Sequence, residues 1–172
     1  SQTLQIMGLD EGFLPFYYGK GLSEGVLVEV IKDFSMETGI EADFRPMARK
    51  RQIWALQRGL ANAVFASPHW MPLPDQMHAV GPVLTWRDRV FAQPGMPTDS
   101  FDDISGSICL RRWFVYSDQL ERRIGTQLVR HDGYNTQQML LMFLRKRCDY
   151  IVMNETEFRF LTMMGGIDPE RY

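Results

Sequence analysis

Arg112 is the residue of this sequence with the most clearly defined chemistry. It follows residues 107–111, an apolar segment typical of a short buried strand, and a helix is expected to begin near Ser117. A guanidinium at the end of a strand can hold a carboxylate through two parallel hydrogen bonds, and the positive end of the following helix favours the same anion. The alternative is a surface arginine paired with a neighbouring acid, and the sequence leaves both open.

Aromatic and polar side chains follow the other expected strands. Rings in the loop after the first strand could form an apolar floor for a ligand with a planar or aliphatic part, or they could pack on the core. Asn154 is the expected N-cap of a helix, and capping explains it without any ligand. A lone histidine such as His69 is more often structural than a ligand contact. The full set of candidate ligand-binding residues is Glu11, Phe13, Phe16, Tyr17, Ser67, His69, Trp70, Arg112, Trp113, Tyr116 and Asn154.

No pattern of catalysis or metal binding accompanies these residues. The sequence shows no arrangement of nucleophile, base and orienting group, no glycine-rich phosphate loop and no paired carboxylate motif. His69, His78 and His131 do not have the spacing of a metal site. We therefore expect a protein that is not an enzyme and has no metal or cofactor. Acid–base chemistry would have to come from Glu11, Glu155 or His69.

Two similar series of short strands and longer helices position these side chains. The first half shows strands near residues 4–9, 42–46 and 61–66, with helices near 27–34 and 49–58. Ser23 is the expected N-cap of the first helix and Gly39 its stop, and Ile53, Trp54 and Leu56 are expected to face inward from the second.

The second half repeats the pattern in the same order. It shows strands near residues 107–111, 126–130 and 149–153, and helices near 117–124, 136–147 and 155–164. Asn135 and Thr136 are the expected N-cap pair of the second of these helices. Strands alternating with helices predict parallel sheets covered on both faces, and ligands in such sheets lie at the carboxyl ends of the strands.

The predicted boundary between the halves lies at Pro94–Pro97, a segment whose prolines and glycine interrupt regular secondary structure. Residues 1–94 then form a first lobe that includes a crossover strand, and residues 95–172 form a second lobe. The carboxyl edges of the two sheets are expected to face each other and to form one cleft.

Composition excludes several classes of partner. The chain has 172 residues, is 45% hydrophobic and 23% charged, and carries a formal net charge of −2. A charge this close to zero gives no broad field for nucleic acid or an anionic membrane, and the only compact basic run is Arg49-Lys50-Arg51. No apolar stretch approaches the roughly 18 to 20 residues that span a bilayer. Cys109 and Cys148 are expected to be buried free thiols, although an oxidising compartment would permit a disulfide.

Five segments in order along the chain resemble family 3 extracellular solute-binding proteins, the type II periplasmic fold of polar amino-acid ABC transporters. They are Pro15-Phe16-Tyr17-Tyr18 followed by Gly21-Leu22-Ser23-Glu24-Gly25, Arg51-x4-Leu56-x-x-Gly59-x-x-Asn62, Gly81-Pro82-Val83, Phe101-Asp102-Asp103-Ile104-Ser105-Gly106, and Leu144-Arg145-Lys146-Arg147-Cys148-Asp149-Tyr150-Ile151. The resemblance implies an α/β protein of two lobes, each built on a mainly parallel sheet flanked by helices. In the family the chain then returns through the hinge to complete the first lobe, and that segment is not seen before Tyr172.

Two departures from the family concern the ligand. Amino-acid binders of this family hold the α-carboxylate with an arginine just before the crossover, whereas residues 71–78 contain none. They hold the α-ammonium with an aspartate, and the matching residue is Asn154. The resemblance therefore implies a solute other than a standard α-amino acid.

The expected function is capture of a small polar solute in the periplasm, for uptake through an ABC-type permease. We expect a monomer that closes about a hinge, does not bind nucleic acid and is secreted, although this sequence shows no signal peptide. The first alternative is the extracellular ligand-sensing domain of a signalling receptor. The second is a lyase or dehydratase on the same fold.

Overall fold

The computed structural model describes residues 3–67, 75 and 77–172, and it divides into two compact units. The units comprise Ser1–Pro82 and Val83–Tyr172. The sequence predicts the boundary after residue 94, twelve residues later than the structure places it. The difference arises from strand β4 (Asp88–Ala92), which pairs along its whole length with β7 (Tyr150–Asn154) of the second unit.

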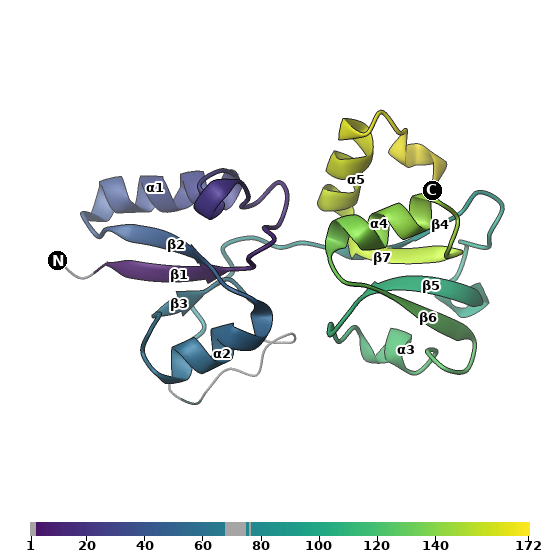
Figure 1. Cartoon of the computed structure of the whole chain (residues 1–172), viewed down its shortest axis with the longest axis horizontal. Coiled ribbons are helices and arrows are strands. Elements are labelled where there is room, and N and C mark those ends of the chain that lie inside the picture. Colours follow the sequence, from purple (N-terminus) through teal and green to yellow (C-terminus); the bar gives the residue numbers. More distant parts are fainter. Residues whose placement is uncertain (1–2, 68–74, 76) are drawn as a thin grey trace. The chain divides into compact units, whose positions relative to one another are not determined.

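The first unit is a three-stranded parallel sheet in the order β2-β1-β3. Its strands are β1 (Leu4–Gly8), β2 (Ala42–Pro46) and the short β3 (Ala63–Val64). Helices α1 (Val26–Thr38) and α2 (Arg49–Gln57) cover opposite faces of this sheet (Figure 1). A single turn of 3-10 helix, Lys20–Leu22, precedes α1. The predicted strand–helix alternation is confirmed, although β3 is shorter than the segment 61–66.

Helix α1 begins and ends at glycines. Its N-cap is Gly25, not the predicted Ser23, whose hydroxyl donates to the carbonyl of Lys20 instead. Gly25 has φ +120°, and a Cβ there would lie 2.4 Å from the carbonyl oxygen of Phe16, so no other residue fits this turn. The predicted stop at Gly39 is confirmed, because this residue is left-handed and its N–H donates to the carbonyl of Ser35.

Helix α2 packs on the core through two of the three residues predicted to face inward, Leu56 and the partly buried Ile53. Its buried residues are Gln52, Ala55 and Leu56, and Ala55 and Leu56 pack against Met7 of β1. Gln52 is accommodated because its side-chain amide donates to the carbonyl of Met47. Trp54, predicted to face inward, is exposed and carries the guanidinium of Arg58 4.4 Å from its ring centre. A cation–π contact replaces core packing at this position.

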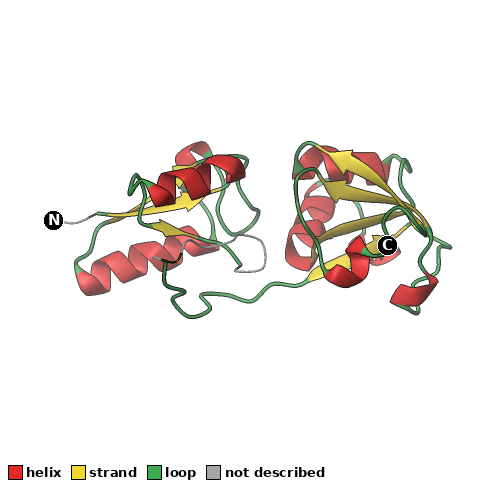
Figure 2. Cartoon of the chain, turned by 90° about the horizontal axis from the view of Figure 1, so that it is seen from below, coloured by secondary structure: helices red, strands yellow, loops and turns green. Residues whose placement is uncertain are grey.

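The second unit is a four-stranded sheet in the order β4-β7-β5-β6. Strands β5 (Gly106–Arg111) and β6 (Leu128–Gly133) are parallel to each other, β7 is parallel to β5, and only β4 is antiparallel. Helix α3 (Asp118–Glu121) covers one face, and α4 (Thr136–Leu144) and α5 (Glu155–Met164) cover the other (Figures 1 and 2). Short 3-10 turns lie at Phe101–Asp103 and Pro169–Arg171.

Alternation along β7 gives this sheet two cores. Ile151 and Met153 pack under α4 and α5 with Phe143 and Phe158, whereas Tyr150 and Val152 pack on the other face with Leu120 of α3. Asn135 caps α4 by accepting from the N–H of Gln138, as the sequence predicts. The sheet is therefore held rigidly from both sides, up to its carboxyl edge.

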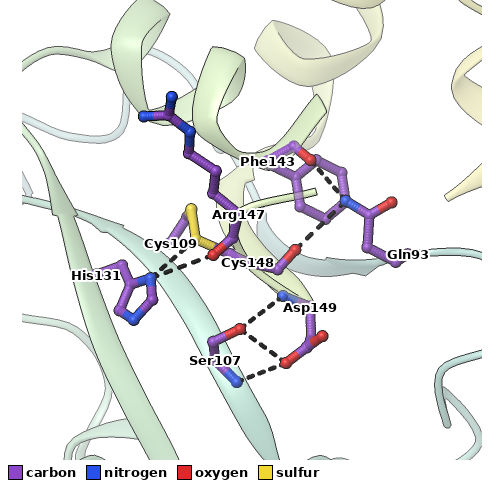
Figure 3. Close-up of a disulfide and its surroundings, with 8 residues drawn as sticks. All are labelled: Gln93, Ser107, Cys109, His131, Phe143, Arg147, Cys148 and Asp149. Carbon is purple, nitrogen blue, oxygen red and sulfur yellow. Dashed lines mark hydrogen bonds between the residues drawn. A yellow bond between two sulfur atoms is a disulfide. The ribbon is translucent and has the colours of Figure 1, made fainter. Parts of the chain in front are cut away.

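Cys109 and Cys148 form a disulfide, so the expectation of free thiols is wrong (Figure 3). Cys109 lies in β5 and Cys148 in the turn before β7, with their Cα atoms 5.6 Å apart and a sequence separation of 39. Beside the disulfide, the Ser107 N–H and hydroxyl both donate to the carboxylate of Asp149, and the Asp149 N–H donates back to Ser107. The same two segments are thus joined covalently and by hydrogen bonds.

Candidate functional site

The carboxyl edge of the second sheet brings together residues from all four strands. Arg111 ends β5 opposite Gly133 at the end of β6, and Asn154 ends β7 opposite Asp88 at the start of antiparallel β4. Arg112 follows directly, and its N–H donates to the carbonyl of Gly133 at 2.9 Å. The predicted position of Arg112 at a strand end is therefore correct.

The Arg112 guanidinium lies against two aromatic rings. Its Cζ is 5.1 Å from the ring centre of Trp113 and 4.8 Å from that of Tyr134. No acidic side chain in the part of the chain that the structure describes lies within ion-pair distance of it. The alternative of a surface arginine neutralised by a nearby acid is thus not what the structure shows.

The two rings that contact Arg112 are open to solvent. Trp113 is 85% exposed and Tyr134 is 65% exposed. Trp113 also has φ +67°, which is unusual for a residue with a large side chain. The arrangement is a half-buried cation surrounded by exposed apolar surface, which can accept an anion together with an apolar group.

Tyr134 was not among the predicted site residues. It follows β6, and the sequence places the end of that strand at residue 130 instead of Gly133. The rule that selected Arg112, the residue directly after a strand, would have selected Tyr134 had the strand end been placed correctly.

Tyr116 lies beneath this surface instead of closing over it. Its hydroxyl accepts from the N–H of Arg111 at 2.8 Å, and its ring packs against the α3-side core. Burial is the main cause of a raised pKa for this phenol, and the hydrogen bond from Arg111 opposes it only in part. Tyr116 therefore stays protonated and supports the backbone from which Arg112 projects.

Asn154 acts as a helix cap, as the capping alternative predicts. Its side-chain oxygen accepts from the N–H of Glu157 at 3.0 Å, and the residue is only 4% exposed. Its amide nitrogen is buried and has no hydrogen-bond partner among the described residues. Opposite it, crowding by neighbouring protein atoms raises the pKa of the Asp88 carboxyl, although much of that residue remains exposed.

Glu155 is poorly suited to the acid–base role that an enzyme would need. Its carboxylate accepts from the guanidinium of Arg89 at 2.7 Å. This hydrogen bond is the main reason that the pKa of Glu155 is lowered. A carboxylate that is held ionised in this way is a weak proton donor and a weak base near neutral pH.

The aromatic candidates of the first unit differ in how deeply they are buried. Tyr17 is buried, its ring lies 5.9 Å from that of Phe44, and its hydroxyl accepts from the N–H of Leu9, so its prediction as an apolar floor for a ligand is wrong. Phe13 and Phe16 are half-buried, with ring centres 4.9 Å apart.

The remaining predicted residues of the first unit are less closely defined. Glu11 is exposed in the loop after β1, and Ser67 is partly buried at the end of the described segment that follows β3. His69 and Trp70 lie outside the described residues. Within the ranges 3–67 and 77–172, no group of three or more metal-binding side chains comes together. In the same ranges no helix is long and apolar enough to cross a membrane.

Comparisons with known proteins identify the fold. No family model and no curated protein matches this sequence. Among solved structures, a histidine kinase sensor domain with similarity to periplasmic binding proteins matches 96% of this chain and 73% of its own, with a TM-score of 0.74 and 18% identity. An ancestral arginine-binding protein bound to arginine matches 95% of this chain and 75% of its own, with a TM-score of 0.72 and 16% identity.

A third structure extends the same likeness to a transport protein. The substrate-binding protein of an amino acid ABC transporter matches 96% of this chain and 75% of its own, with a TM-score of 0.64 and 18% identity. These identities are too low to transfer a ligand. They show that this chain has the two-lobed α/β fold of periplasmic amino-acid-binding proteins, as the sequence motifs predict.

Proposed function

We propose that this protein is an extracytoplasmic solute-binding protein that captures a small polar ligand for ABC-type uptake. The observation that carries the proposal is the likeness of nearly the whole chain to periplasmic binding proteins. The disulfide between Cys109 and Cys148 supports it, because such bonds persist in oxidising compartments outside the cytoplasm.

The proposed contacts are assigned within each unit separately. In the second unit we assign Arg112 and Trp113 to the ligand, with Arg112 supplying the charged contact. In the first unit we assign Phe13 and Phe16 on the strength of their half-buried rings. Glu11, Ser67, His69 and Trp70 remain predictions from sequence. We assign Asn154 primarily to capping of helix α5 and not to the ligand.

A sensing role is the second candidate. The likeness to a histidine kinase sensor domain favours it, since that structure shares the fold across 96% of this chain. Both roles require the same event, the binding of a small solute. An enzymatic role is less well supported, because the acidic candidate at the second edge, Glu155, is held ionised by Arg89.

A thermal-shift screen against amino acids, polyamines, small carboxylates and sugars tests the proposal directly. A ligand present at 100 times its dissociation constant adds about 2.7 kcal/mol to the free energy of unfolding, which such a screen detects readily. We expect at least one class to raise the melting temperature, and calorimetry then gives its dissociation constant. A folded protein that none of these classes stabilises would refute solute binding.

A further inference from the structure

We propose that the solute is a monocarboxylate whose carboxylate is attached to a flat apolar body, and that Arg112, Trp113 and Tyr134 select it. This inference rests on the proposed function and specifies the chemical class of its ligand. All three side chains belong to the second unit, so it depends on no contact with the first.

The charge at the site indicates a carboxylate. Arg112 is half-buried and makes no ion pair with any described residue, whereas the nearby Arg130 is already paired with Asp132. The planar guanidinium of an arginine can donate two parallel N–H hydrogen bonds to a planar oxyanion. The single charge of Arg112 balances that of a carboxylate. A phosphate monoester carries closer to two charges and would need a second cation.

The surroundings of that charge indicate an apolar body. Trp113 and Tyr134 expose most of their surface directly beside the guanidinium. Water is a poor solvent for these groups, and an aromatic or unsaturated ring stacked on them would remove that surface from water. An acetate-sized anion would leave it uncovered.

The backbone at Trp113 gives independent support. A residue with a large side chain and φ +67° is strained, and glycine would fit there without strain. The ring is almost fully exposed, so packing in the core does not explain why tryptophan occupies the position. Strained residues of this kind concentrate at binding sites, where the side chain itself is needed.

The size of the surface favours a small molecule over a protein. A guanidinium and the two rings that contact it make up the site, which is far less than the roughly 800 Å² per partner of a specific protein interface. Among the described residues no acidic side chain forms an ion pair with Arg112, and the nearby Asp132 is held by Arg130.

Calorimetry with four matched probes tests the chemical class. The probes are 3-phenylpropionate, propionate, 3-phenylpropylamine and phenyl phosphate, titrated into the full chain. We expect 3-phenylpropionate to bind at least tenfold more tightly than each of the others. Equal or tighter binding of the amine, of propionate or of phenyl phosphate would overturn the assignment of an aryl or similarly flat carboxylate.

Variants test the residues. Arg112→Gln should weaken 3-phenylpropionate binding about thirtyfold or more, and Arg112→Lys should restore only part of it. Tyr134→Ala should weaken it roughly threefold to tenfold and leave propionate unchanged. Arg122→Gln is the matched control, because it removes the same charge from an exposed arginine of the same unit, and it should bind like the parent. Binding by Arg112→Gln within threefold of the parent would refute the proposal.

The outcome also separates this inference from the proposed function. A sugar or polyamine that binds the parent and Arg112→Gln equally would refute the carboxylate assignment and leave solute binding intact. Failure of every class in the thermal-shift screen would refute solute binding, and the carboxylate assignment with it.

Discussion

Reduction of the Cys109–Cys148 disulfide should destabilise the second unit strongly. The bond closes a loop with a sequence separation of 39 residues. Closing a loop of this length removes chain entropy from the unfolded state worth about 4 kcal/mol at 25 °C. Domains of this size are stable by only about 5–15 kcal/mol, so the loss takes a large share of the total. Both cysteine side chains are buried in the oxidised chain.

Urea unfolding with and without dithiothreitol measures this loss. With a urea dependence of about 1–3 kcal/mol per molar, the midpoint of the second unit should fall by about 2 M on reduction. The first unit contains no cysteine, so its transition provides an internal reference. The variant Cys109→Ala/Cys148→Ala is the control, since dithiothreitol should not affect a chain without cysteines. A difference below about 1 kcal/mol between the oxidised and reduced forms would contradict the reasoning.

Three further predictions concern a turn, a buried phenol and ligand specificity. Gly25→Ala should lower the free energy of unfolding by about 1–3 kcal/mol because the added Cβ would meet a backbone carbonyl. Gly81→Ala is the control and should cost little, since a Cβ there meets open space. Thermal unfolding of both variants measures the difference. Tyr116→Phe should cost about 1–3 kcal/mol because the Arg111 N–H loses its acceptor. Since burial raises the pKa of Tyr116, the parent should also lose stability above about pH 10, where only the unfolded phenol ionises, and Tyr116→Phe should lose less in urea titrations at pH 8 and 11. Glutamate, glutamine and arginine should bind weakly or not at all because Asn154 replaces the family's aspartate, and calorimetry giving a micromolar constant for any of them would contradict this.

Most of the element order could be predicted from the sequence because it depends on local periodicity. Helix α5 (Glu155–Met164) and strand β2 (Ala42–Pro46) lie exactly where the apolar pattern places them. The boundary between the units could not be predicted in the same way. Whether residues 88–92 belong to the first or the second unit depends on pairing with β7, sixty residues later, and periodicity carries no information about the partner.

Only those candidate site residues that directly follow one strand could be predicted from the sequence. Arg112 follows from the end of β5, but its contact with Tyr134 depends on the register between β5 and β6. Tyr17 shows the opposite failure, because an aromatic residue in a loop looks the same in sequence whether it packs on Phe44 or faces a ligand. The disulfide was missed for a related reason, since only the fold brings Cys148 next to β5.

The hydrogen bonds between Ser107 and Asp149 have a consequence for how the disulfide re-forms. These hydrogen bonds join the segments that carry Cys109 and Cys148 independently of the covalent bond. In folded, reduced protein the effective concentration of one thiol at the other is therefore high. Oxidation is then an intramolecular reaction between two thiols that the fold already holds close together. The chain does not need the disulfide to find its native pairing, and with no third cysteine it has no wrong pairing to make within one molecule.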